Sequence, residues 1–232
     1  MNKVLIKATR LILEYDQYGS ITYMKKRERK RVLKGLSFEL HEGEILGLIG
    51  RNGCGKSTTL SILADIIEQD YGAVDRNCGN ISLLNFNSGM IPHLSGLDNI
   101  FLQGYFIGLS HKEVMELKDQ IVELSELGES IDQPVSTYSS GMKAKLGFSV
   151  GYHLKSDVIL IDETLGVGDF AFREKSSRMM KEKILNNSGA IIVTHDEGLL
   201  KDMCTRCIVV HKGVNAFDGP PEEALAYYKE NT

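Results

Sequence analysis

The stretch Gly50–Ser57 reads GRNGCGKS, which matches the pattern G-x-x-x-x-G-K-S of a phosphate-binding loop. It follows the apolar run EILGLI at residues 44–49, which is typical of a buried strand. It leads into STTLSILA at residues 57–64, which is typical of the first turns of a helix. A strand, a glycine-rich loop and a helix are the context that this motif requires, so the stretch predicts an α/β domain that holds the phosphates of a nucleotide.

The residue types in this loop have separate physical reasons. Its three glycines let the backbone turn tightly and point several N–H groups at one place beside a helix N-terminus, which favours a bound anion. We expect Lys56 to reach the β- and γ-phosphates and Ser57 to offer a hydroxyl ligand to Mg²⁺. The predicted nucleotide-binding residues of the loop are Gly50, Asn52, Gly53, Gly55, Lys56, Ser57 and Thr58.

The overall composition excludes several classes of protein. The chain has 232 residues, of which 42% are hydrophobic and 25% are charged, which suits a globular domain with a sizeable core. Its formal charge of −4 gives no overall attraction to nucleic acid, so we expect no nucleic-acid partner. The sequence shows neither an apolar run of roughly 18–20 residues nor a signal peptide, so we expect a cytoplasmic protein that does not itself cross the membrane.

The cysteines do not indicate a disulfide framework, because four are too few at this length. Cys204 and Cys207 form a single C-x-x-C pair, without the second pair or the thioredoxin-like surroundings that a metal or redox role requires. We therefore expect reduced, partly buried thiols.

Apolar patterning outside the loop predicts the rest of the architecture. Short apolar strands alternate with helical periodicity, which indicates a parallel sheet covered on both faces. From about residue 94 to residue 154 the helical period continues over successive helices, which indicates an inserted helical subdomain. The expected strands lie at residues 4–15 (one or two strands), 33–40, 44–49, 73–75, 81–84, 157–162 and 190–194, with turns at residues 41–43 and 70–72.

A basic segment interrupts the first strands. The sequence KKRERKR at residues 25–31 carries six basic residues and one acid. We interpret it as a solvated, mobile insertion. The alternative is a contact with an anionic membrane surface or with a phosphate-bearing substrate.

Three further segments carry side chains that suit nucleotide chemistry. The strand at residues 157–162 leads into Asp162 and Glu163; after a phosphate-binding loop, the first acid suits Mg²⁺ and the second suits a water that attacks the γ-phosphate. The sequence SSG at residues 139–141 opens an apolar-rich helix, where serine favours a helix start. His195 follows the last core strand, where a lone histidine is usually structural.

Taken together and in this order, these segments resemble an ATP-binding cassette (ABC) ATPase. Residues 50–57 match the Walker A motif, and YSSGM at residues 138–142 matches the L-S-G-G-Q signature. The pair Asp162–Glu163 matches Walker B with its catalytic glutamate, Asp169 matches the D-loop aspartate, and His195 matches the switch histidine. The resemblance extends over nearly the whole chain.

The resemblance implies a P-loop NTPase fold of the ABC ATPase type. Such a fold has a mainly parallel core sheet flanked by helices, an antiparallel β subdomain and an inserted helical subdomain. We expect one ABC ATPase domain over residues 1–232. Its RecA-like core and β subdomain would comprise about residues 1–93 and 155–232, and its helical subdomain, with the signature motif, about residues 94–154.

The resemblance also implies ATP hydrolysis with ATP and Mg²⁺ as cofactors. Lys56, Glu163 and His195 would be catalytic, and Ser57 and Asp162 would bind Mg²⁺. Two copies of the chain would pair head to tail and sandwich each ATP. The signature residues acting on the partner's ATP would be Ser139, Ser140 and Gly141.

Two parts of the family pattern stay open in this sequence. An aromatic residue should stack on adenine, and Tyr15 fits best by its place after the first strands, ahead of Tyr18 and Tyr23. The Q-loop segment NFNSGM at residues 85–90 contains no glutamine. Either Asn85 or Asn87 is a candidate replacement.

The motif variants resemble the subfamily that exports lipid-linked polysaccharides, such as O-antigen, teichoic acid and capsule. The segments that carry this resemblance are YSSGM at residues 138–142, IDETLGVGDFAF at residues 161–172 and FDGPPEEA at residues 217–224. It implies two copies of a separate membrane-spanning permease as partners, a lipid-linked glycan as the transported substrate, and a peripheral location on the cytoplasmic face of a bacterial inner membrane.

Three other functions compete with this hypothesis. A cassette that energises transport of a different substrate, such as a lipid or a drug, is the first alternative. A soluble ABC protein without a transport role is the second, although such proteins usually fuse two cassettes or carry long coiled-coil insertions. A plain P-loop kinase or GTPase is the third, but the sequence has no guanine-reading N-K-x-D motif.

Overall fold

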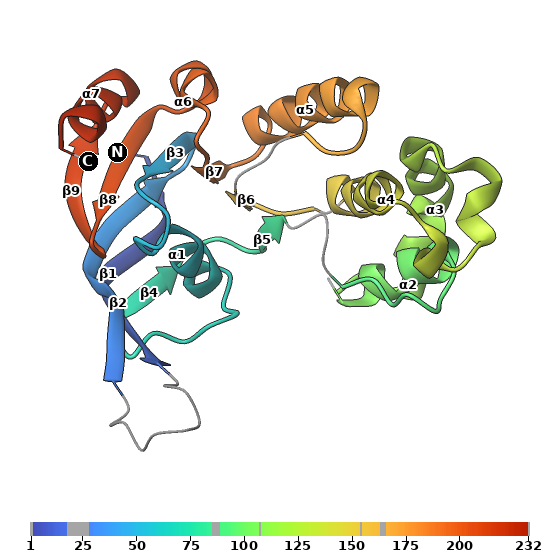
Figure 1. The fold of residues 1–232 in the computed structure, drawn as a ribbon, viewed down its shortest axis with the longest axis horizontal. Helices are drawn as coiled ribbons and strands as arrows, with labels where there is room; N and C mark the ends of the chain where they lie inside the picture. Colours follow the sequence, from blue (N-terminus) through green and yellow to red (C-terminus); the bar gives the residue numbers. More distant parts are fainter. Residues whose placement is uncertain are drawn as a thin grey trace. The chain divides into compact units, whose positions relative to one another are not determined.

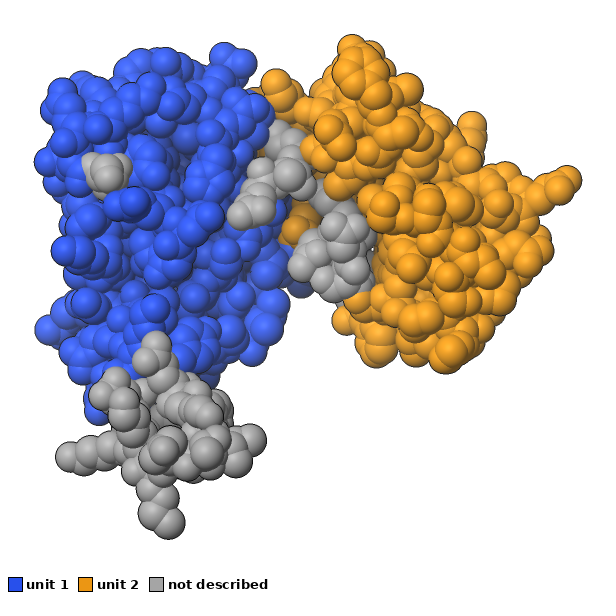
Figure 2. Space-filling view, in the orientation of Figure 1, with its two compact units in different colours: residues 1–83, 156–163, 187–232 blue, residues 84–155, 164–186 orange. Residues whose placement is uncertain are grey.

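The computed structural model divides the chain into two compact units, drawn as a ribbon in Figure 1 and in blue and orange in Figure 2. Unit 1 is built on two β-sheets and unit 2 on helices. Unit 1 comprises residues 1–83, 156–163 and 187–232, and unit 2 comprises residues 84–155 and 164–186. The structure describes residues 2–17, 28–84, 89–106, 108–153, 155–162 and 166–231.

Over the described residues, the main sheet of unit 1 has six strands in the order β5-β6-β7-β3-β8-β9. Strand β3 pairs in parallel with β7 and β8, and β6 pairs in parallel with β7, whereas β9 is antiparallel to β8. The mainly parallel sheet predicted from the apolar runs is thus confirmed. Its strands are β3 (Glu44–Ile49), β5 (Ile81–Leu84), β6 (Val158–Asp162), β7 (Gly189–Val193), β8 (Arg206–His211) and β9 (Val214–Gly219).

Both faces of the main sheet are covered, which explains why its central strands are apolar throughout. On one face, Leu46 and Leu48 are fully buried together with Leu60 of α1 and with leucines of the second sheet. On the other face, Gly47 lies against Leu200 of α6, and α7 packs on β8, β9 and β3. The helices of unit 1 are α1 (Lys56–Leu63), α6 (Glu197–Met203) and α7 (Pro221–Asn231).

The C-x-x-C pair belongs to the second of these faces. Cys204 and Cys207 are free and buried, and their sulfur atoms occupy the space beside Gly47. A Cβ on Gly47 would stand 3.2 Å from the sulfur of Cys204 and closer still to that of Cys207. The pair therefore packs as small apolar side chains in the core.

The second sheet of unit 1 is antiparallel, in the order β2-β1-β4. The prediction of a turn at residues 70–72 is wrong, because β4 already begins at Tyr71. Gly72 has φ +97° and passes very close to β1, so that an added Cβ would collide with the carbonyl oxygens of Thr9 and Arg10. At this point the pairing between β1 and β4 changes register. A glycine at this point signals a close approach between strands rather than a chain reversal. The strands are β1 (Val4–Gln17), β2 (Glu28–His41) and β4 (Tyr71–Arg76).

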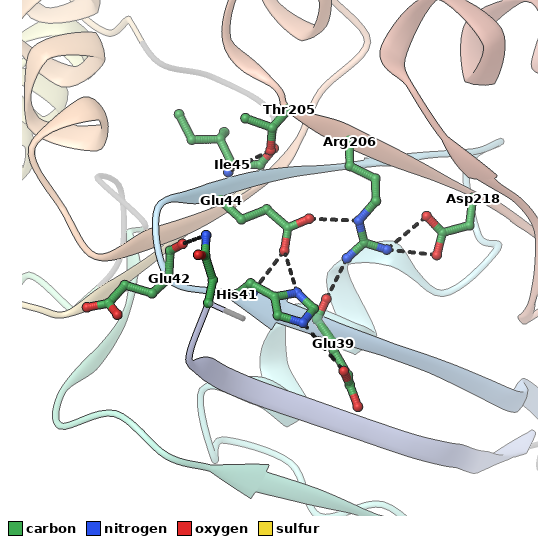
Figure 3. Close-up of polar contacts among 9 residues, drawn as sticks. Glu39, His41, Glu42, Glu44, Ile45, Thr205, Arg206 and Asp218 are labelled. Carbon is green, nitrogen blue, oxygen red and sulfur yellow. Dashed lines mark hydrogen bonds and ion pairs between the residues drawn. The ribbon is translucent and has the colours of Figure 1, made fainter.

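A network of charged groups closes the amino end of the main sheet (Figure 3). Arg206, the first residue of β8, bonds through Nε to Glu44 Oε1 at 2.7 Å and through Nη1 to both oxygens of Asp218 at 2.8 Å. Its Nη2 donates to the carbonyl oxygen of Glu39 at 2.6 Å. The second oxygen of Glu44 accepts from the backbone N–H of His41 at 2.8 Å. The starts of β3 and β8 are thereby tied to each other and to the ends of β2 and β9.

Unit 2 is helical around its own apolar core. Ile100, Val114, Leu146 and Val150 are buried in this core, together with residues of the short helices between α3 and α4. The helices predicted at about residues 94–154 are therefore confirmed, and α5 also belongs to this unit. No helix in the described ranges combines the length and apolar character needed to cross a bilayer. The helices of unit 2 are α2 (Gly96–Phe106), α3 (His111–Ser125), η1 (Gly128–Asp132), η2 (Val135–Thr137), α4 (Ser140–Tyr152) and α5 (Phe170–Leu185).

Candidate functional site

The strand register brings the predicted site residues of unit 1 to one edge of the main sheet. Leu48 of β3 pairs with Val193 of β7, which pairs in turn with Asp162 of β6. The chain leaves β3 into the phosphate-binding loop two residues after Leu48, and it reaches His195 two residues after Val193. Because the carboxyl ends of adjacent parallel strands meet at the same edge, the loop, His195 and Asp162 share this edge.

The loop at residues 50–57 has the tight backbone that its glycines predict. Gly55 precedes α1 in a left-handed conformation at φ +110°, which favours glycine, and its carbonyl oxygen accepts the backbone N–H of Thr59 at 2.8 Å. A Cβ on Gly50 would meet the carbonyl oxygen of Val210 and stand 2.7 Å from the sulfur of Cys54. The loop therefore lies directly on the sheet. As at any helix N-terminus, the first N–H groups of α1 have no partner within the helix.

Lys56 is held inside this loop. Its side chain is 7% exposed, and its Nζ donates to the carbonyl oxygens of Gly50 at 2.6 Å and Arg51 at 3.2 Å. An ammonium group has three donors, so one remains beyond these two bonds. No ion pair of Lys56 occurs among the described residues. A buried cation of this kind is a suitable partner for a phosphate oxygen.

His195 meets the loop at Asn52, which lies 143 residues earlier in the chain. The Nε2 atom of His195 lies 3.2 Å from Oδ1 of Asn52, and both side chains are exposed. Since an amide oxygen only accepts, Nε2 carries the hydrogen in this contact. The turn that presents His195 is fixed from both sides, because Thr194 Oγ1 accepts the N–H of Asp196 at 3.1 Å and Asp196 caps α6.

Asp162 offers a buried carboxylate oxygen. Its Oδ1 atom is buried and has no hydrogen-bond partner in the described part of the chain. Helix α1, which begins with Lys56 and the exposed Ser57, packs against β6, the strand that ends in Asp162. A hydroxyl and an unpaired carboxylate oxygen are ligand types that Mg²⁺ prefers, so these two residues fit the metal.

The signature residues lie in unit 2, at the N-terminus of α4. Ser139 caps this helix, and its Oγ accepts the backbone N–H of Met142 at 3.1 Å. Ser139 and Ser140 are exposed, so the first N–H groups of α4 face solvent beside two hydroxyls. This arrangement suits an anion, since donors and the positive end of the helix dipole coincide.

Tyr138, the residue before this cap, is buried and anchors it. Its side chain is 5% exposed, and its hydroxyl donates to the carbonyl oxygen of Ser130 in η1 at 2.5 Å. The same hydroxyl lies against Gly96 at the start of α2, where a Cβ would collide with it. The start of α4 is thus fastened to the core of unit 2.

Asp169 also lies in unit 2, as the N-cap of α5. Its Oδ1 accepts the backbone N–H of Phe172 at 3.0 Å, and its Oδ2 pairs with Nζ of Lys145 at 2.8 Å. The Lys145 hydrogen bond lowers the pKa of the Asp169 carboxyl, and Asp169 raises the pKa of Lys145. The sequence gives no signal for this role of Lys145, because its partner lies 24 positions away and no local pattern joins the two residues.

Several predicted residues stay untested by this geometry. Glu163, Asn85, Asn87, Tyr18 and Tyr23 lie outside the described residues. Tyr15 is described; it lies on β1, and 42% of its surface is exposed, so a ring face is accessible. The basic segment is described only from residue 28, where it forms the start of β2.

A comparison with protein families matches residues 33–166 to the family described as ABC transporter. The chain belongs to the ABC transporter family. Two solved ABC structures show the same fold at low sequence identity. A dimeric ATP-binding cassette in a post-hydrolysis state bound to ADP and Pi gives a TM-score of 0.73 at 20% identity, covering 93% of this chain and 98% of that one. The ATP-binding subunit of an ABC transporter gives a TM-score of 0.72 at 19% identity, covering 97% of this chain and 93% of that one.

Curated relatives of this ABC chain carry names from two export systems. The teichoic acids export ATP-binding protein TagH of Lactococcus lactis is 44% identical over 99% of the chain. The O-antigen export system ATP-binding protein RfbB of Klebsiella pneumoniae is 37% identical over 88% of the chain and 83% of its own length. The chain spans 51% of the length of the Lactococcus TagH. The family and the ABC ATPase fold implied by the motifs are thus confirmed.

Proposed function

We propose that this ABC chain is the ATP-hydrolysing subunit of an exporter that moves a lipid-linked polysaccharide of the O-antigen, teichoic acid or capsule type. The observation that carries the ATPase proposal is the meeting of the phosphate-binding loop, His195 and Asp162 at one edge of the main sheet. The substrate class is supported by the names of the relatives and by the motif variants at residues 138–142 and 161–172.

In this proposal the loop binds ATP through the groups described above. The N–H groups at the start of α1, which have no partner within the helix, and the third donor of Lys56 bind the β- and γ-phosphates. Ser57 and Asp162 would hold Mg²⁺, which would neutralise charge on the phosphates. Tyr15 stacks on the adenine. Most of the rate enhancement then comes from positioning and fixed charge rather than from covalent chemistry.

Glu163 and His195 complete the proposed catalytic set. Glu163, directly after Asp162, orients or deprotonates the attacking water, a role that contributes about 10²–10⁴-fold to the rate. His195 is hydrogen-bonded through Nε2 to Asn52 of the loop, and in this proposal it acts on the γ-phosphate. We expect Glu163→Gln to retain ATP binding, to lose nearly all turnover and to trap the ATP-bound dimer. Normal hydrolysis by this variant would remove Glu163 from the role of base.

The second copy of the chain supplies the signature. Ser139, Ser140 and Gly141 at the start of α4 act on the ATP held by the partner's loop, with Asp169 nearby in the closed dimer. One chain therefore carries half of each site. Two such chains associate with two copies of a membrane-spanning permease, on the cytoplasmic face of a bacterial inner membrane, and ATP-driven closure and hydrolysis run the transport cycle.

The surface polysaccharide of the native host tests the substrate class. We expect Lys56→Ala to remove the long-chain ladder or wall polymer from a polysaccharide gel while the precursor accumulates inside the cell. Lys112→Ala, at a lysine whose side chain is 86% exposed on α3, is the matched control and should leave the polymer unchanged. An unchanged surface glycan with stable Lys56→Ala protein, in a host without a redundant exporter, would contradict the substrate class but not the ATPase.

Two alternatives remain distinguishable by simple experiments. A cassette that serves a lipid or drug transporter would co-purify with a permease but would leave the surface glycan intact when inactivated. A soluble ABC protein would be absent from the membrane fraction and would pull down no permease.

A further inference from the structure

Unit 2 contains a compact ionic cluster that joins three helices. Glu126 closes α3, Lys145 lies on the second turn of α4, and Asp169 caps α5. Phe172 and Lys175, in the first two turns of α5, complete the cluster. It joins two of the proposed partner-facing motifs, since α4 begins at the signature and α5 begins at Asp169.

Lys145 lies at the centre of this cluster. Its Nζ is 2.8 Å from Asp169 Oδ2, 3.3 Å from Glu126 Oε2 and 5.0 Å from the centroid of the Phe172 ring. Its side chain is only 15% exposed, so the aliphatic stem is packed and the head group is fixed. Such a contact differs from a mobile surface ion pair, which contributes little to the stability of the fold.

Asp169 uses its two oxygens for two different helices. Oδ1 caps α5 by accepting the N–H of Phe172, and Oδ2 binds Lys145 of α4. A displacement of Lys145 would therefore change the start of α5 as well as the charge on that carboxylate. Among the described contacts, Lys145 is the residue of the signature helix that binds Asp169, and the ring of Phe172 also packs edge-on against Phe148 of α4.

Lys175 contacts the same carboxylate and the same ring as Lys145 from a more exposed position. Its Nζ lies 2.7 Å from Glu126 Oε1 and 5.8 Å from the Phe172 ring. The described contacts of Lys175 do not include Asp169. The two lysines thus share a carboxylate and an aromatic ring. They differ in the contact with Asp169 and in exposure, since the side chain of Lys175 is 39% exposed and that of Lys145 is 15% exposed.

We infer that Lys145 is a positioning residue that holds Asp169 and the signature residues 139–141 as one rigid element for presentation to the second copy of the chain. The inference rests on the proposed function, in which both motifs act on the partner's ATP. It predicts that loss of Lys145 impairs assembly of the composite site and turnover, and leaves ATP binding by the loop of unit 1 unaffected.

A matched pair of variants tests this inference by steady-state ATPase kinetics. Lys145→Met and Lys175→Met each remove one charge, one contact with Glu126 and one cation beside Phe172. We expect Lys145→Met to lower kcat about ten- to a hundredfold with KM for ATP within about twofold of the wild type. We expect Lys175→Met to change kcat by no more than about twofold, and Lys145→Arg to retain most of the activity. Equal kcat values for the two methionine variants would overturn the inference.

A second comparison covers the case in which Lys145→Met folds poorly. Asp169→Asn keeps a side chain that caps α5 well and removes the charge that Lys145 binds. If the two residues act through their contact, Lys145→Gln and Asp169→Asn lower kcat by similar factors, and the double variant is no worse than either single variant. If the factor by which kcat falls in the double variant equals the product of the factors in the two single variants, the inference is overturned.

The wild type and Lys56→Ala separate this inference from the proposed function. ATPase activity that Lys56→Ala abolishes supports the proposed function. If that holds and Lys145→Met behaves like Lys175→Met, only the positioning role fails. If the wild type neither hydrolyses ATP nor dimerises with it, the proposed function fails and the inference fails with it.

Discussion

The two ends of the main sheet differ in how their polar groups are satisfied. At the amino end, where β3 and β8 begin, Arg206 and Glu44 bond to each other and to neighbours on β2 and β9 (Figure 3). At the carboxyl end, Asp162 keeps a buried oxygen without a partner among the described residues. Within the same described residues, Lys56 bonds to carbonyl oxygens of its own loop and to no acidic side chain.

This difference indicates that the polar groups at one end of the main sheet stabilise the fold, whereas those at the other end serve binding or catalysis. A buried polar group without a partner costs about 1–3 kcal/mol, so such groups persist where binding or catalysis uses them. We therefore interpret the amino end as the stabilising end and the carboxyl end as the functional end. Variants at the two ends should have opposite profiles of activity and stability.

Replacement of Lys56 should have the largest effect on activity. Lys56→Ala removes the donor that we propose binds the phosphates, and we expect ATP turnover to fall about 10²–10³-fold or more. The free energy of unfolding should stay equal or rise, because a buried cation without an acidic partner is costly in the unliganded protein. Urea denaturation and an ATPase assay on the same preparation measure both quantities. A large loss of stability would contradict this profile.

Replacement of Arg206 should show the opposite profile. Arg206→Met leaves Glu44 partly buried without its guanidinium partner, so we expect a loss of about 2–4 kcal/mol in the free energy of unfolding. KM for ATP should not change. Lys229→Met, which breaks the exposed pair with Glu197 at 2.7 Å, is the control and should cost less than about 1 kcal/mol. Similar losses of unfolding free energy in Arg206→Met and Lys229→Met would show that the network at the amino end stabilises the protein no more than an exposed ion pair does.

The tyrosine that anchors the signature extends the comparison to unit 2. Tyr138→Phe removes the hydroxyl bonded to Ser130, so we expect a loss of about 1 kcal/mol in stability and a severalfold loss in kcat. Tyr105→Phe removes an exposed hydroxyl that lies 2.7 Å from His111 Nδ1 in the same unit, and should leave kcat unchanged. Equal kcat in the two variants would show that the anchor does not position α4.

The pH dependence of stability gives the smallest expected effect. Burial raises the pKa of the Glu44 carboxyl, but the hydrogen bond from Arg206 and the backbone N–H of His41 outweigh it and leave the pKa lowered. A lowered pKa in the folded state means that the ionised carboxyl stabilises the protein above its unfolded pKa near 4.5 and that this contribution disappears as the pH falls through the folded pKa. The difference in unfolding free energy between wild type and Glu44→Gln should therefore be full at pH 7 and shrink below about pH 4.5. A difference that grows on acidification would contradict the assignment.

The sequence predicted those parts of the fold that depend on residues close together in the chain. The run at residues 44–57 specified β3, the loop and the start of α1, because apolar periodicity, glycine and a helix start lie next to one another. The register of β3, β7 and β6 then placed His195 and Asp162 at the same edge, as parallel strands require.

Contacts between distant residues could not be predicted in this way. The Asn52–His195 contact spans 143 positions, and the Lys145–Asp169 pair joins two helices whose packing no local pattern reports. Gly72 resembles a turn signal in the sequence, yet its cause is the close passage of β4 over β1. In each case the deciding neighbour comes from another element of the tertiary structure.

We propose that unit 1 of one chain and unit 2 of a second chain form each ATP site. A mixture of two inactive variants distinguishes such a shared site from a site formed within one chain. Lys56→Ala damages only the loop, and Ser139→Arg damages only the signature. In a mixed dimer, one site then combines both defects and the other is intact. We expect an equal mixture to recover about a quarter of the wild-type ATPase activity, given random pairing. A mixture no more active than either variant alone would show that two chains do not share each ATP site.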